Sequence, residues 1–145
     1  MSNYDQIGRL FDAGERLGAV RYSMFDVGSS DGQDWIDAVE LQFEGGTIAS
    51  IYVDSEFDCL RLEFGEIEIR EQCYAIDASG AIPWAQVLGR NVSWIWLLTN
   101  HQGYEDGLRL EFSGDAKDKE ENIVTLIGIA SKIEVFSSTK VSLWF

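Results

Sequence analysis

Residues 28–32, Gly-Ser-Ser-Asp-Gly, have the letters of a nucleophile elbow, G-x-S-x-G, with Ser30 in the place of the attacking serine. That motif works because a turn from a strand into a helix exposes the serine beside an oxyanion hole. Here the residues that follow lead into another strand pattern, so the helix that the mechanism requires is missing. We interpret the segment as a flexible turn and assign no catalytic residue to it.

His101 is the only histidine of the chain, so any imidazole chemistry would depend on it. It lies at residues 100–104, a segment that corresponds to the Ser30 turn when the two halves of the chain are aligned. A single loop histidine is more often a surface or hydrogen-bonding residue than a catalyst. Whether Ser30 or His101 has a chemical role stays open at this point.

Acidic residues alternate in two stretches whose oxygens could hold calcium or magnesium, residues 54–58 and 115–121. Neither stretch has the glycine and the final glutamate of an EF-hand loop. One histidine and two separated cysteines, Cys59 and Cys73, do not make a structural zinc set. We therefore predict no metal and no cofactor, and we interpret the acidic stretches as solvated faces.

Four glutamates would permit acid-base chemistry by a pair of carboxyl groups: Glu63, Glu66, Glu68 and Glu71. The separation that would identify such a pair does not follow from the sequence. The chain has neither a phosphate-binding P-loop nor a dinucleotide-binding fingerprint. These observations favour a protein that is not an enzyme.

The net charge of −14, from 25 acidic and 11 basic residues, narrows the class of partner. Such a chain repels nucleic acids and anionic membrane surfaces, and it attracts basic proteins. No apolar run approaches the ~20 residues of a membrane span, and the N-terminus lacks the pattern of a signal peptide. We therefore expect a cytoplasmic protein with reduced cysteines.

The two halves of the chain resemble each other. Residues 35–43, WIDAVELQF, align without a gap on residues 104–112, YEDGLRLEF, and weaker matches extend on both sides. Self-similarity of this kind predicts repeated structural units. We predict a single domain, residues 1–145, with repeats at residues 5–72 and 81–138 and a terminal strand at residues 141–145.

Each repeat is expected to begin with a helix and to continue in four largely antiparallel strands. Ile7, Leu10 and Phe11 have helical spacing, and Pro83 opens a second, shorter helix. Apolar residues alternate with polar ones in residues 37–43, and residues 57–70 are interpreted as one long strand with a β-bulge at Gly65.

Residues 92–98 are apolar on both faces and are expected to form a central strand, with Trp94 and Trp96 in the core. The predicted fold class is α+β, with an internally duplicated helix-plus-four-strand unit. Mostly antiparallel, bent sheets would carry two short helices on their apolar face.

The stretch WLLTNHQGY, residues 96–104, together with the Asp-Gly-Leu and Glu-Phe pairs that follow it, is similar to an uncharacterised family of small bacterial proteins. The resemblance covers mainly the second half of the chain. It implies a bacterial cytoplasmic protein and brings no catalytic residues. In composition alone, the chain also resembles the immunity proteins that neutralise cationic toxins.

Our leading hypothesis is a non-enzymatic, acidic protein-interaction module, with an immunity or inhibitor protein as its narrower form. The residues expected to contact a basic protein partner are Asp31, Asp34, Trp35, Asp54, Glu56, Asp58, His101 and Tyr104. One alternative is a small-molecule-binding or weakly hydrolytic protein with a pocket between the repeats, near Ser30, Trp35, His101 and Tyr104. Another is a structural subunit that forms a homodimer through the edge strand near Phe145.

Overall fold

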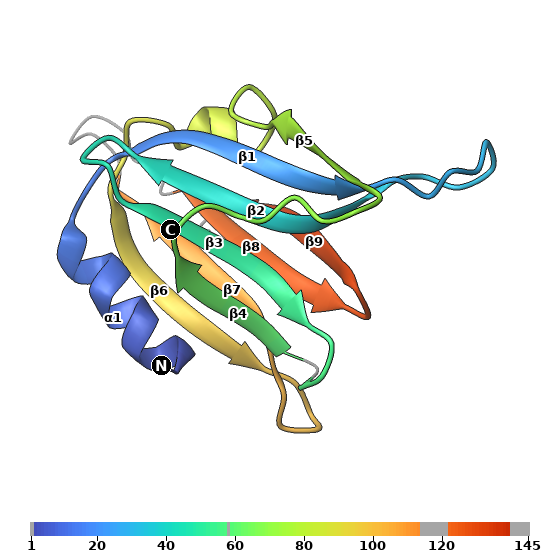
Figure 1. The fold of residues 1–145 in the computed structure, drawn as a ribbon. Helices are drawn as coiled ribbons and strands as arrows, with labels where there is room; N and C mark the ends of the chain where they lie inside the picture. Colours follow the sequence, from blue (N-terminus) through green and yellow to red (C-terminus); the bar gives the residue numbers. More distant parts are fainter. Residues whose placement is uncertain (1, 58, 114–121, 140–145) are drawn as a thin grey trace, which may run out of the picture.

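Alternating apolar residues build one antiparallel sheet in the computed structural model, which describes residues 2–57, 59–113 and 122–139 (Figure 1). Within these residues the chain forms one α-helix, α1 (Asn3–Ala13), a short 3₁₀ helix, η1 (Trp84–Gln86), and nine strands. The strands are β1 (Leu17–Phe25), β2 (Trp35–Phe43), β3 (Ile48–Asp54), β4 (Cys59–Phe64), β5 (Cys73–Asp77), β6 (Val92–Thr99), β7 (Glu105–Phe112), β8 (Asn122–Ile129) and β9 (Lys132–Thr139).

The sheet has two arms that meet at β2. One arm has the order β5-β1-β2-β3-β4 and the other has the order β9-β8-β7-β6, and all neighbours are antiparallel. The arms join next to the last pair between β2 and β3, where Ile36 pairs with Ile133 of β9. The whole sheet curls into a half-barrel (Figure 1).

A β-bulge in β2 lies at the junction of the arms. Ser23 pairs with Ala38 and Met24 pairs with Ile36, so Asp37 has no partner in β1. An extra residue of this kind bends a strand and changes the direction of its side chains. Ile36 therefore packs against the core, whereas Asp37 and Ala38 lie on the outer face of the sheet, the side away from the core.

The core fills the space between the arms. Its largest fully buried apolar side chains are Leu17, Val20, Val39, Leu41, Ile51, Trp84, Val87, Leu110, Phe112, Val124 and Leu126. Trp84 comes from η1, and its indole N–H donates to the hydroxyl of Tyr22.

The helix α1 packs against β4 and β6, the end strands of the two arms. The Ser2 hydroxyl accepts a backbone N–H of the first turn at 3.2 Å, and Gly14 ends the helix with a φ of 61°. The Asn3 side chain donates to the Leu60 carbonyl at 2.6 Å and accepts the Leu62 N–H at 3.0 Å. In the part of the chain that is described, no helix is long and apolar enough to cross a membrane.

The predicted α+β class is wrong, because the structure is mostly antiparallel sheet with one α-helix in the described residues. Pro83 precedes only the three-residue η1, so the second half has no counterpart of α1 in the described chain. The duplicated helix-plus-four-strand unit is therefore not supported; antiparallel neighbours in each half follow from short hairpin connections, which need no duplication. The predicted terminal strand, residues 141–145, lies outside the described residues.

The position of β6 also differs from the prediction. This strand, expected at the centre of a sheet, is the end strand of its arm. Trp94 and Trp96 were expected in the core, but they are 53% and 37% exposed, and Trp94 packs edge-on against Phe11 of α1. Apolar residues on both faces of β6 reflect the core on one side and an exposed aromatic patch on the other.

Candidate functional site

Residues 65–72, here named the strap, connect β4 to β5 across the outer face of the sheet. The chain leaves β4 at Gly65, whose φ of 119° is readily adopted only by glycine. It reaches β5 at the opposite edge of the same arm, because β5 pairs only with β1 in the described residues. The predicted strand over residues 57–70 is therefore wrong: it ends at Phe64, and the change of apolar parity at Gly65 marks the start of the crossing.

Glu40 anchors the middle of the strap. Its carboxylate is fully buried on the outer face and accepts the Ile67 N–H at 2.8 Å, Arg21 Nη2 at 2.9 Å and Gln42 Nε2 at 2.6 Å. Burial raises the pKa of Glu40, but these three hydrogen bonds together lower it by a larger amount. The pKa of Glu40 therefore lies below the ordinary value. The ionised carboxylate thus fixes both the strap and the side chain of Arg21.

Asp37 and Arg70 form the second link between the sheet and the strap. Arg70 Nε donates to Asp37 Oδ2 at 3.3 Å, and Arg70 Nη2 donates to Asp37 Oδ1. The Asp37 side chain is 6% exposed, whereas that of Arg70 is 64% exposed. A buried carboxylate at the β-bulge is therefore covered by a guanidinium that faces the solvent.

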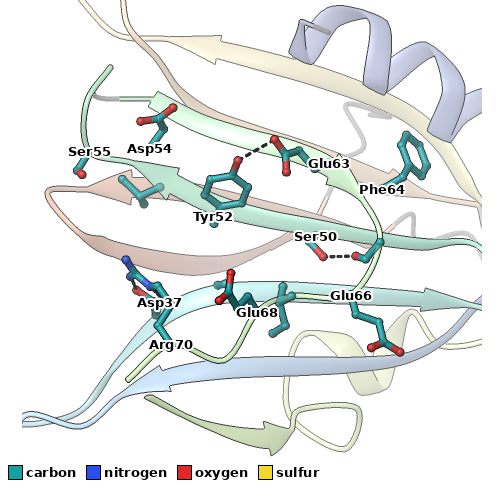
Figure 2. Close-up of a pocket in the computed structure, with 14 residues that line it drawn as sticks. Asp37, Ser50, Tyr52, Asp54, Ser55, Glu63, Phe64, Glu66, Glu68 and Arg70 are labelled. Atoms are coloured by element: carbon teal, nitrogen blue, oxygen red, sulfur yellow. Dashed lines mark hydrogen bonds and ion pairs between the residues drawn. The ribbon is translucent and has the colours of Figure 1, made fainter. Parts of the chain in front are cut away.

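A cleft of about 500 Å³ lies between the strap and the outer face of β2, β3 and β4 (Figure 2). Its lining residues are Asp37, Ala38, Ser50, Tyr52, Val53, Asp54, Ser55, Glu63, Phe64, Gly65, Glu66, Ile67, Glu68 and Arg70. Figure 2 shows Tyr52 and Glu63 on the β3–β4 side of the cleft and Glu66 and Glu68 on the strap side. The cleft therefore has carboxylates on both walls.

Tyr52 provides an aromatic surface inside the cleft. Its hydroxyl donates to Glu63 Oε1 at 2.8 Å. Burial, and then this hydrogen bond to a carboxylate, raise the pKa of Tyr52 to about 12. Tyr52 is consequently a neutral hydrogen-bond donor at physiological pH, and it holds the carboxylate of Glu63 in place.

The described residues that the sequence predicts to contact a partner lie in or directly beside the β1–β2, β3–β4 and β6–β7 connections, at one end of the sheet (Figure 1). Asp31 is exposed in the β1–β2 connection, and Asp34 accepts the Val27 N–H at 3.1 Å and the Tyr74 hydroxyl. The hydrogen bond from Tyr74, and then that from Val27, lower the pKa of Asp34.

Trp35 begins β2 and is half-buried. Its ring stacks on Phe25 with 4.5 Å between centroids, and the Lys132 ammonium lies 4.9 Å from its ring centre. Trp35 is therefore engaged by neighbours within the chain, although part of it stays accessible.

The β3–β4 and β6–β7 connections carry the other predicted contact residues. Asp54 accepts Arg61 Nε at 3.2 Å and the N–H of Glu56, which is itself exposed, at 3.1 Å. His101 is exposed, and Tyr104 is 41% exposed. Asp58 lies outside the described residues.

The structure brings only some of these residues together. Asp54 lines the cleft, and Tyr104 lines a second hollow of about 280 Å³. Val53 lines both, so the two hollows are neighbours. Ser30, Trp35 and His101 line neither of them, so the pocket expected around Ser30, Trp35, His101 and Tyr104 is not found in these two hollows.

The sequence does not identify Asp37 or Arg70 as residues of a site, although both line the cleft. The alternation in residues 37–43 predicts Asp37 on the apolar face, but the β-bulge moves it to the outer face. Glu63, Glu66 and Glu68 had been recognised as a group of glutamates, and all three line the cleft. No local pattern in the sequence marks Arg70 as a site residue, because its partner Asp37 lies 33 positions earlier in the chain.

Metal ligation has no support in the described chain, where no group of three or more histidine, cysteine, aspartate or glutamate side chains could hold an ion. Cys59 and Cys73 are both half-buried.

Fold and cleft together define an antiparallel half-barrel protein with an acidic cleft beneath a crossing strap. The chain belongs to a family of unknown function, DUF6334, which it matches over residues 2–142. This membership confirms the expectation of an uncharacterised family. No curated protein and no solved structure matches the chain.

Proposed function

We propose that this chain is a non-enzymatic binding protein that holds a basic segment of a partner protein in the cleft beneath the strap. The observation that carries the proposal is the imbalance of charge in the cleft, where, among the described residues, five carboxylates line the walls against one cation, Arg70. The carboxylates belong to Asp37, Asp54, Glu63, Glu66 and Glu68.

The concave shape of the cleft strengthens the negative electrostatic potential of its carboxylates. Like charges that line a concave surface with a poorly polarisable wall raise the local concentration of counter-ions. The net charge of −14 attracts a basic partner from a distance and speeds its capture. Charge complementarity of this kind sets the choice of partner and the association rate more than the final affinity.

Two aromatic side chains provide the affinity that charge alone does not. Tyr52 and Phe64 both line the cleft. Aromatic residues at the centre of an interface bury a large area at low cost in side-chain entropy. The aliphatic stem of an arginine or lysine from the partner can pack on these rings while its charged end reaches the carboxylates.

A basic toxin held in this way would make the chain an inhibitor of the immunity-protein type. That narrower proposal rests on the same cleft and on the same direction of charge complementarity.

Titration calorimetry with an oligoarginine peptide and an oligolysine peptide tests the proposal. The double variant Glu66→Gln, Glu68→Gln removes two charges from the strap wall, and we expect it to weaken binding by about tenfold, as two exposed ion pairs of ~0.7 kcal/mol each would. The affinity of the unchanged protein should also fall as salt is raised.

The matched control is Glu105→Gln, Glu134→Gln, which removes the same charge at exposed positions that do not line the cleft. It should change the affinity by less than about threefold. Equal losses in the two double variants would mean that the peptides follow the net charge and not the cleft, and would contradict the proposal.

A further inference from the structure

We propose that the Asp37 carboxylate is the subsite of the cleft that binds an arginine side chain, and that Arg70 occupies this subsite in the free protein. The inference rests on the proposed function and adds to it the chemical class of the group selected, a guanidinium. The partner's arginine takes the place of Arg70 when the basic segment binds.

The geometry at Asp37 fits a guanidinium. The two carboxylate oxygens accept two different nitrogens of Arg70, Nε and Nη2. A planar fork of this kind is available to arginine and not to lysine, whose ammonium is a single point of charge. The buried carboxylate faces the cleft, because Asp37 is 6% exposed and lines it.

Arg70 can leave without detaching the strap. Its side chain is 64% exposed, so it gives up little packing when it turns towards solvent. The strap has anchors of its own, since Ile67 N–H donates to Glu40 at 2.8 Å and the Gly65 carbonyl accepts the Ser50 hydroxyl. Replacement of Arg70 is therefore a local side-chain exchange.

The exchange requires an incoming cation. A buried carboxylate left without its partner is strongly destabilising, so Arg70 leaves Asp37 only when another charged donor arrives. Because an occupied subsite must be vacated before it can bind, the apparent affinity for arginine is reduced by the presence of Arg70. Replacement of Arg70 should therefore strengthen the binding of an arginine side chain, because Asp37 is then vacant and the other lining residues of the cleft are unchanged.

Calorimetry with oligoarginine and oligolysine peptides on Arg70→Gln tests the inference. We expect oligoarginine to bind about tenfold more tightly than to the unchanged protein, and oligolysine to gain less than about threefold. Arg16→Gln, which removes the same charge at an exposed position outside the cleft, should change both affinities equally and slightly. Adding Asp37→Asn to Arg70→Gln should abolish the arginine-specific gain.

The outcomes separate this inference from the proposed function. Binding that depends on Glu66 and Glu68 but shows no arginine-specific gain in Arg70→Gln would overturn the inference and leave the proposed function standing. Binding that is insensitive to Glu66 and Glu68 would overturn both.

Circular dichroism establishes whether Arg70→Gln folds. If it does not, Arg70→Lys keeps the charge but loses the fork, and it should give a smaller gain that is still specific for oligoarginine. If Arg70→Lys changes the affinities for oligoarginine and for oligolysine by the same factor, relative to the unchanged protein, the inference is overturned.

Discussion

Glu40 holds the strap and the Arg21 side chain against the outer face of the sheet. A polar residue at this position looks, from the alternation of β2, like part of a solvated face. The strap covers it, so that its carboxylate becomes completely buried and serves three donors. Buried charge is tolerated only when it is paired and hydrogen-bonded, and here the pairing also fixes where the strap crosses.

Glu40→Gln is expected to lower the free energy of unfolding by about 3 kcal/mol at neutral pH, because Arg21 and the Ile67 N–H lose their charged acceptor. Urea denaturation measures this loss. Glu44→Gln, at an exposed position in the β2–β3 turn, should cost less than about 0.5 kcal/mol. Equal stability of the two variants would show that the Glu40 network contributes nothing.

The pH dependence of stability provides an independent measure of Glu40. Its folded-state pKa is lowered relative to the unfolded chain, so its contribution is complete above the ordinary glutamate pKa of about 4.3. That contribution is lost as the pH falls through the lower, folded-state pKa. In Glu40→Gln the unfolding free energy should therefore decline less steeply with acid than in the unchanged protein.

Tyr52 gives a prediction at the alkaline end of the pH scale. Ultraviolet titration should show one phenolate that forms at about pH 12, and Tyr52→Phe should remove it. Its folded-state pKa is raised, so the stability it contributes is present below about pH 10 and is lost as the pH rises towards 12. Glu63→Gln should lower the pKa of Tyr52; an unchanged titration would mean that the hydrogen bond to Glu63 has no effect.

At the scale of elements, the chain could be predicted where neighbours in sequence are neighbours in space. The alternation in residues 37–43 and the Gly45-Gly46 turn indicate the β2–β3 hairpin, and the helical spacing near Leu10 indicates α1. Elements that depend on distant contacts could not be predicted. The course of the strap is fixed by Glu40 and Asp37, which lie 27 and 33 positions before their strap partners.

The predicted site shows the same limit. The group of glutamates in residues 63–68 is visible in the sequence because its members are close together. Asp37, which lines the cleft from β2, is far from this group in sequence and faces the cleft only because of the β-bulge. A one-residue change of register in a strand reverses the direction of its side chains, and no local pattern reveals it here.

The contact of α1 with β4 is a testable property of these elements. Asn3→Ala removes both hydrogen bonds that the side chain makes with the β4 backbone, and we expect a loss of about 2 kcal/mol in unfolding free energy. Hydrogen exchange of the Leu62 amide should accelerate, because that N–H loses its acceptor. Tyr4→Ala, at a position that is 79% exposed, should leave both measurements nearly unchanged.

Across the whole molecule, repulsion and attraction between charges oppose each other. The net charge of −14 favours expansion of the chain, whereas ion pairs such as Arg21–Glu40, Arg61–Asp54 and Arg70–Asp37 favour the folded state. Salt screens exposed charges over a Debye length of ~10 Å at 0.1 M and screens buried pairs much less. Glu40 and Asp37 are buried, so salt should weaken the attraction in their ion pairs less than it weakens the repulsion between exposed acidic side chains.

The temperature of half-unfolding should therefore rise by a few degrees when sodium chloride is raised from about 0.01 M to about 0.2 M at pH 7. Arg16→Gln adds one unit of net negative charge at an exposed position and should lower that temperature in dilute salt. The difference between Arg16→Gln and the unchanged protein should shrink as salt is added, because screening weakens the repulsion that separates them. A fall in the unfolding temperature with salt would mean that attraction within exposed ion pairs outweighs the repulsion between acidic side chains. It would contradict the expectation that net repulsion destabilises the folded protein.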